Sequence, residues 1–178
     1  MKQTLLSLML LCGFALHSQN GSICGDFDGD GELEYAYMTY PDIYDENDDV
    51  IYLDYPTTYI HFSKESIPTI RVDTCTGGNL QNLGDLNGDN RDEIGLWCGW
   101  PSSLYLLYAS WTFDVKAWQT FMDSYSIKIT LWETYGFNFK PIQKINGEKL
   151  LVYYTDLFDK VKVKEVKTKN RRHIRFGK

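Results

Sequence analysis

Histidine is scarce in this chain: the 178 residues contain three, and only His61 and His173 lie beyond residue 18. His61 stands in a strand-like pattern, where packing is its ordinary role, and His173 lies in a basic tail. The sequence also has no Gly-x-Ser-x-Gly elbow, no His-Glu-x-x-His motif and no phosphate-binding glycine loop. It therefore offers no recognisable catalytic set, although two carboxylates brought together by folding could still form a hydrolase site.

Basic residues are few outside the C-terminal end. Residues 160–178 hold nine Lys and Arg against one acid, whereas the rest of the chain holds nine Lys and Arg against 23 acids, and the formal net charge is −6. A protein that reads duplex nucleic acid needs a basic docking face, so this acidic body argues against a nucleic-acid partner. Lysine alternates with valine over 160–164, which is typical of a charged edge strand. The tail could instead contact an anionic polysaccharide or lipid.

Long apolar runs are absent except at the start of the chain. Lys2 precedes about a dozen apolar residues, a pattern that predicts a secretory signal peptide over residues 1–18, cleaved after Ala15 or Ser18. The run is shorter than the roughly 20 apolar residues that span a membrane. We therefore predict an exported protein, periplasmic, at the cell surface or secreted, in which residues 19–178 form a single β domain without a transmembrane segment.

Cysteine occurs only four times. Cys12 lies in the signal segment and could carry a lipid anchor, although Leu11 is not the small residue expected before such a cysteine. In an oxidising compartment a pair is expected among Cys24, Cys75 and Cys98. We predict a disulfide between Cys75 and Cys98 because they bracket a hairpin-sized segment. The alternative is three buried thiols.

β-Branched and aromatic residues, by contrast, are abundant and often alternate with polar ones. Such alternation predicts half-buried strands. It occurs, with short apolar runs, near 50–55, 58–62, 69–72, 103–113, 126–132, 150–154 and 161–166. Turn signals such as Asn146-Gly147 separate these segments. We predict an all-β domain of short antiparallel strands, with Ala117–Tyr125 as the one place that suits a short helix.

Two segments of the chain align without a gap. Residues 25–36 and 84–95 match over twelve positions, 59 residues apart, and each is followed by a strand-like stretch and a proline. Repeats at this spacing are typical of propellers and solenoids. The alignment divides the domain into two repeats, about 24–83 and 84–120, and a third blade-like segment, about 121–178, that has no acidic loop.

Each repeat opens with oxygen donors at alternating positions. The predicted ligands are Asp26, Asp28, Asp30, Glu34 and the carbonyl of Glu32 in the first copy, and Asp85, Asn87, Asp89, Glu93 and the carbonyl of Arg91 in the second. Calcium accepts six to eight hard oxygens, and carboxylates this close would otherwise repel one another. We predict two Ca²⁺ sites. The second is weaker because Asn87 lacks a charge and Asn90 replaces Gly31. The alternative is solvated aspartate turns without metal.

The flanks of these loops separate them from EF-hands. An EF-hand needs a bidentate Glu at position 12 and flanking helices, whereas Tyr37 and Leu96 stand there. Gly25–Glu34 and Gly84–Glu93 resemble instead the FG-GAP/VCBS calcium loop of integrin α-like β-propellers, Gly-Asp-x-Asn/Asp-Gly-Asp-Gly-x-x-Asp before a short strand, with Glu as the final acid.

That resemblance covers about 30 of the 178 residues. It implies that the same side chains ligate calcium and that antiparallel blade-like sheets form the fold. Three such sheets are too few to close a propeller. The fold expected is therefore a small propeller-like assembly, a partial propeller or a β-sandwich.

Two further stretches are candidates for partner contact. The acidic segment contributes Asp45, Glu46, Asp48 and Asp49, and an aromatic-dense stretch contributes Trp97 and Trp100. The first is a solvated hairpin tip or a docking site for a basic partner. The second is core or an exposed recognition patch for protein or sugar.

These features together predict an exported, non-enzymatic, calcium-binding β module that binds another macromolecule, a protein or alternatively a glycan. The loops also resemble, more weakly, those of periplasmic lysozyme inhibitors and immunity proteins. A charge of −7 after Lys2 is removed with the signal would suit a basic cell-wall hydrolase as target. The third alternative is a hydrolase with an unrecognised carboxylate pair.

Overall fold

The computed structural model describes residues 21–42, 44–47, 49, 54–99, 103–136, 138–156 and 158–169. The predicted signal peptide at 1–18 lies outside these residues, as do Asp48, Trp100 and the arginine-rich end of the tail. The described residues form eleven strands and one helix. The all-β class predicted from alternation is thus confirmed, and no closed barrel forms among the described strands.

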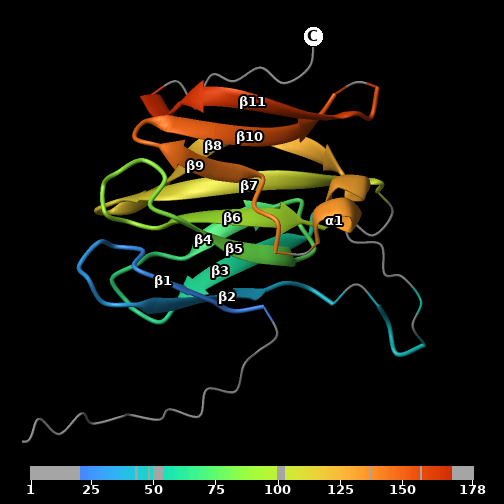
Figure 1. Ribbon diagram of the computed structural model, residues 1–178. Helices are drawn as coiled ribbons and strands as arrows, with labels where there is room; N and C mark the ends of the chain where they lie inside the picture. The colour runs from blue at the N-terminus through green and yellow to red at the C-terminus, as the bar shows by residue number, and fades with distance from the viewer. Residues whose placement is uncertain are drawn as a thin grey trace, which may run out of the picture.

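The strands make three antiparallel sheets in which neighbours follow chain order. The first contains β1 (Ile23–Gly25), β2 (Glu34–Thr39), β3 (Thr57–Phe62) and β4 (Ile70–Asp73). The second contains β5 (Gly78–Gly84), β6 (Glu93–Cys98), β7 (Tyr105–Asp114) and β8 (Ala117–Lys128). The helix α1 (Ile129–Tyr135) precedes the third sheet, β9 (Ile142–Asn146), β10 (Lys149–Thr155) and β11 (Val161–Lys167). Figure 1 shows the first sheet at the bottom and the third at the top.

The boundaries of the sheets differ from those of the predicted repeats. The second sheet begins at Gly78 and ends at Lys128, whereas the repeats were placed to end near residues 83 and 120. The alignment marks the acidic loops, and each loop joins the first two strands of its sheet. The first strand of a sheet therefore lies before the aligned segment, where the alignment could not find it.

Two hydrophobic cores separate the three sheets. Ile60, Ile70, Ile94 and Leu96 belong to the core shared by the first and second sheets. Trp97, Tyr108, Phe121, Leu150 and Val152 belong to the core shared by the second and third. Every residue of β6 is buried, because this strand lies in a sheet covered on both faces. The middle sheet therefore holds the other two together.

The predicted position of the helix is wrong. Ala117–Tyr125 forms most of β8, which pairs with β7 along its length. The helix instead covers Ile129–Tyr135, where the sequence pattern predicted a continuing strand. Leu131 of this helix is fully buried in the core against the third sheet. Burial of that side chain outweighs the weak strand preference of its β-branched neighbours.

Cys75 and Cys98 form a disulfide, the pairing favoured on sequence grounds, across a separation of 23 residues. Both are buried, and Cys98 pairs in register with Gly78 at the start of β5. The bond ties the end of β6 to the segment that connects the first and second sheets. Cys24 is a free, exposed cysteine, so the alternative of three buried thiols is wrong.

Candidate functional site

The two acidic loops have the same backbone course. The first loop, residues 25–34, joins β1 to β2, and the second loop, residues 84–93, joins β5 to β6. Gly29 and Gly88 have φ of 79° and 84°, and Gly31 has φ of 88°. Asn90 adopts the same left-handed conformation as Gly31, with φ of 64°. Asparagine tolerates this region better than most residues, so the substitution leaves the turn unchanged.

Aspartate side chains fold the first loop round itself. Asp26 accepts hydrogen bonds from the backbone N–H groups of Gly29 and Gly31 at 2.8 and 3.0 Å. Asp30 accepts one from the N–H of Glu32 at 2.9 Å. These bonds satisfy backbone donors that a tight loop leaves without strand partners.

The second loop repeats this pattern with its own residues. Asp85 accepts from the N–H groups of Gly88 and Asn90 at 2.6 and 3.2 Å. Asp89 accepts from the N–H of Arg91 at 3.0 Å. The alignment of the two segments thus corresponds to equivalent local structures.

A buried glutamate closes each loop. Glu34 is 3% exposed and Glu93 is fully buried. One oxygen of each, Oε2, accepts a backbone hydrogen bond: from Phe27 N–H at 3.0 Å and from Leu86 N–H at 2.6 Å. Removal from water raises the pKa of both carboxyls, and raises that of Glu93 to about 7. A nearby cation would lower the pKa of these carboxyls, because it favours their charged form.

In the first loop, three carboxylates converge. Ligand oxygens of Asp26, Asp28 and Glu34 all lie within 4.8 Å of one another. The ammonium group of Lys64 pairs with two of them, 2.5 Å from Oδ2 of Asp28 and 3.7 Å from Oε1 of Glu34. It also donates to Asp30 and lowers the pKa of that carboxyl. Lys64 is thus the counter-ion of Asp28, Asp30 and Glu34, and a metal ion bound by Asp28 and Glu34 would compete with it.

In the second loop, the neutral amide of Asn87 hydrogen-bonds to the acidic side chains. Nδ2 of Asn87 donates to Oδ2 of Asp89 at 3.1 Å and to Oε1 of Glu93 at 2.9 Å. The hydroxyl of Thr112 also donates to Oε1 of Glu93, at 2.9 Å. Among the described residues, only the first loop brings three acidic side chains within metal-binding distance of one another. The second loop could hold a cation only if Asn87 turned its amide oxygen inward.

The two loops lie side by side. The N–H of Asp92 donates to the carbonyl of Asp26 at 2.8 Å, and the N–H of Asp26 donates to the carboxylate of Asp92 at 3.2 Å. Nε of Arg91 donates to the carbonyl of Asp28 at 3.0 Å. Lys144 of β9 makes a similar contact to the carbonyl of Asp85, at 2.7 Å. Each loop is therefore held by a residue of the following repeat or sheet.

Sequence reasoning missed Lys64, Asp92 and Lys144, all of which contact the loops. Lys64 lies 30 residues beyond Glu34 in the sequence. It reaches the first loop because Ser63 pairs with Tyr35, through Ser63 N–H to the Tyr35 carbonyl at 2.9 Å. No local spacing signals this contact, because it depends on how β2 and β3 pair.

The acidic candidate segment forms an exposed turn. Asp45, Glu46 and Asp49 are exposed. Asp45 accepts hydrogen bonds from the N–H groups of Asn47 and Asp49 at 2.8 and 3.0 Å, which lowers its pKa. Its carboxylate therefore shapes the turn, and Glu46 and Asp49 are the residues open to a partner.

The aromatic candidate Trp97 is not available to a partner. It is fully buried and packs edge-to-face on Tyr108, with ring centroids 5.2 Å apart. Alternation within β6 did not reveal this, because both faces of its sheet are covered. Two other tryptophans, Trp111 and Trp118, are partly exposed at a cavity described below.

No protein-family model, curated protein or solved structure matches this chain. The similarity to FG-GAP/VCBS loops therefore rests on the loop residues themselves. Within the part of the chain that the structure describes, no helix is long and apolar enough to cross a membrane.

Proposed function

We propose that this protein is an exported, non-enzymatic β module that binds calcium in its first acidic loop and binds another macromolecule. The observation that carries the calcium proposal is the convergence of Asp26, Asp28 and Glu34, two of which, Asp28 and Glu34, already pair with the ammonium group of Lys64. In the structure, the cation beside these carboxylates is the ammonium group of Lys64, which belongs to the chain itself.

The donor set favours calcium over other metals. The converging ligands are carboxylate oxygens, without imidazole or thiolate, and such hard donors suit Ca²⁺ or Mg²⁺. Calcium accepts irregular loops of six to eight oxygens, and Asp30 and the Glu32 carbonyl are close enough in sequence to contribute. Magnesium demands a stricter octahedron and keeps more of its water. The second loop is a weaker site of the same kind.

Blade-like organisation supports the structural part of the proposal. The first two sheets are four-stranded meanders, and in each the acidic loop joins strands one and two. Asp92 and Arg91 bind the backbone of the first loop, so the loops lie at the junction of two sheets. We infer a partial propeller in which a cation in the loop stabilises this junction.

Titration of the metal-free protein tests the calcium proposal. Calorimetry with CaCl₂ should give a saturable heat and raise the melting temperature, whereas MgCl₂ should do so weakly. Asp28→Asn should abolish the stronger binding event, and Asp123→Asn, on the exposed side of β8, should leave it unchanged. Equal behaviour of the two variants, or no calcium-dependent heat, would reject the site.

Inhibition of a basic cell-wall hydrolase is the second candidate function. It is favoured by the exposed acids Glu46 and Asp49 on a chain of net charge −6. Opposite charge accelerates association and orients the partners. A lysozyme titrated with the protein should lose activity at a one-to-one ratio, less so at high salt and less so with Glu46→Gln/Asp49→Asn. Unchanged lysozyme activity at excess protein would remove this candidate for that enzyme.

A further inference from the structure

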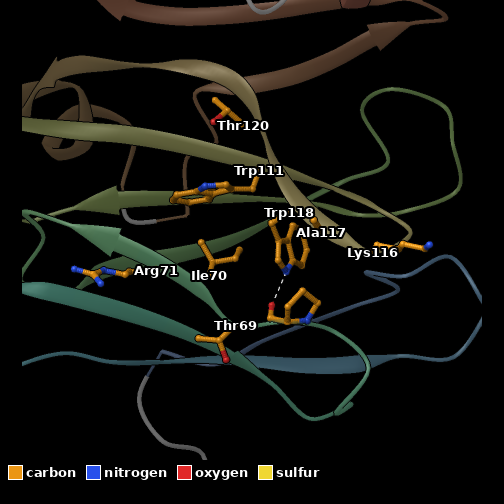
Figure 2. Close-up of a pocket in the computed structure, with 9 residues that line it drawn as sticks. Thr69, Ile70, Arg71, Trp111, Lys116, Ala117, Trp118 and Thr120 are labelled. Atoms are coloured by element: carbon orange, nitrogen blue, oxygen red, sulfur yellow. Dashed lines mark hydrogen bonds between the residues drawn. The ribbon is translucent and has the colours of Figure 1, made fainter.

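A cavity of about 360 Å³ opens between the first and second sheets, away from the acidic loops. Figure 2 shows it between the end of the first sheet and the β7–β8 turn. Its lining includes Ile70, Arg71, Trp111, Lys116, Trp118 and Thr120. This size fits a small molecule or one unit of a polymer.

Two indole rings supply the apolar walls, and Trp118 is fixed. Its Nε1–H donates to the carbonyl of Pro68 at 2.8 Å, the bond drawn in Figure 2. Its ring stacks on Phe62 with centroids 5.0 Å apart, and tilts against Phe113 at 5.1 Å. Trp111 packs partly against the same core and lies above Ile70 in Figure 2. A ring held in this way offers a flat surface without losing freedom on binding.

The charged groups at this cavity are positive, on a chain that is negative overall. Arg71 and Lys116 belong to the lining and lie at opposite sides in Figure 2, and the lining contains no carboxylate. Nε of Arg71 donates to Asp73 at 2.8 Å, and the side chain is 64% exposed. Among the described residues, neither the terminal nitrogens of Arg71 nor the Lys116 ammonium makes a further ion pair. Charge complementarity therefore selects an anionic occupant.

Hydroxyl groups complete the cavity. Thr69 and Thr120 belong to the lining; the hydroxyl of Thr69 lies 3.4 Å from Nδ1 of His61, and that of Thr120 can donate to or accept from the hydroxyls of an occupant. The set of indole faces, threonine hydroxyls and two cations matches one chemical class: a pyranose ring with an apolar C–H face, several hydroxyls and a carboxylate. A purely aromatic anion would use the rings and the cations but leave the hydroxyls unused.

We infer that this cavity binds uronic acid units of an acidic glycan, with a sugar face on Trp111 or Trp118 and with the carboxylates of separate units toward Lys116 on one side and Arg71 on the other. This inference rests on the macromolecule-binding half of the proposed function and names its ligand class. It is independent of the calcium half, since none of the loop residues lines the cavity.

Nuclear magnetic resonance of the full-length mature protein gives the sharpest test. The probe is a short oligogalacturonate, and the matched neutral probe is its methyl ester, which keeps the ring and removes the charge. The acid should shift the indole N–H signals of Trp111 and Trp118, assigned with Trp111→Phe and Trp118→Phe. The ester should shift them at concentrations at least about fivefold higher.

Variants that remove one positive charge test which cations of the cavity contribute to binding. Lys116→Gln should weaken oligogalacturonate binding about fivefold, with Arg71→Gln additive, while Lys140→Gln, an exposed lysine elsewhere, should have no effect. Equal binding of benzoate and oligogalacturonate would overturn the sugar assignment. Absence of any shift at Trp111 and Trp118 would overturn the site. Chelation of calcium separates the two proposals: the shifts should persist in EDTA, while the calcium-dependent heat is lost.

Discussion

The ammonium of Lys64 lies 2.5 Å from Oδ2 of Asp28 in the first acidic loop. Its hydrogen bonds to Asp28 and Asp30 raise the pKa of the lysine, so it stays protonated. Glu34 is nearly inaccessible to water, and Lys64 is the nearest described cation to its free oxygen. The loop therefore carries its own counter-ion, and the proposed calcium ion would have to displace it.

Lys64→Gln tests this competition. In EDTA the melting temperature should fall, because the loop carboxylates lose their cation. In calcium the variant should bind about fivefold more tightly than the natural protein, because no ammonium must leave. Calorimetry and thermal melting measure the two effects. Lys149→Gln is the matched control, since it breaks an exposed ion pair to Glu165 remote from the loops. Calcium affinity that stays the same or falls would contradict the displacement.

Asn87→Asp should destabilise the protein without metal and strengthen calcium binding by the second loop. Without metal, the amide bonds to Asp89 and Glu93 are replaced by carboxylate repulsion, so stability should fall by roughly 1–3 kcal/mol. With calcium, a second binding event should become measurable, because the loop gains a charged carboxylate at the position equivalent to Asp28 and loses the amide donor. Denaturant unfolding measures the loss of stability, and calorimetry measures the second binding event. A variant that loses stability equally in both conditions would argue against a latent site.

Burial of Glu93 predicts a pH dependence in metal-free protein. Its pKa is about 7 in the folded state, above the ordinary value of 4.5, so the folded protein holds this proton more tightly than the unfolded chain. The contribution of Glu93 to the free energy of unfolding is therefore fully present below about pH 4.5. As pH rises through 7, this contribution falls by about 3 kcal/mol. Urea unfolding in EDTA across this range measures the loss.

Glu93→Gln should flatten that dependence, and Glu148→Gln, at an exposed turn, should not. A Glu93→Gln profile that keeps the full slope would show that another group titrates.

The acidic loops could be predicted from the sequence because their structure is local. Asp26 and Asp85 bind backbone groups three and five residues away, and Gly31 and Asn90 both tolerate positive φ. The strands were predictable for a similar reason, since alternation reports one buried face. The metal prediction itself stays untested.

Contacts that depend on sheet pairing could not be predicted. Lys64 reaches Asp28 only through the pairing of β2 with β3. Trp97 is buried because the third sheet covers the face of β6 on which it lies. The sequence pattern of β6 does not show that both of its faces are covered. The helix at Ile129–Tyr135 likewise follows from the place that the core offers to Leu131, which no local propensity encodes.

The disulfide between Cys75 and Cys98 predicts a stability difference that does not involve the loops. Replacing both cysteines by serine should lower the free energy of unfolding by about 2–4 kcal/mol, because the bond closes a segment of 23 residues in the unfolded chain. Cys24→Ser should have little effect, since that cysteine is exposed and unpaired. Guanidinium unfolding of the three proteins gives the comparison, and thiol labelling of the unreduced, unfolded protein without residues 1–18 should count one reactive cysteine. Three labelled thiols, or equal stability of the double variant, would show that the bond does not form.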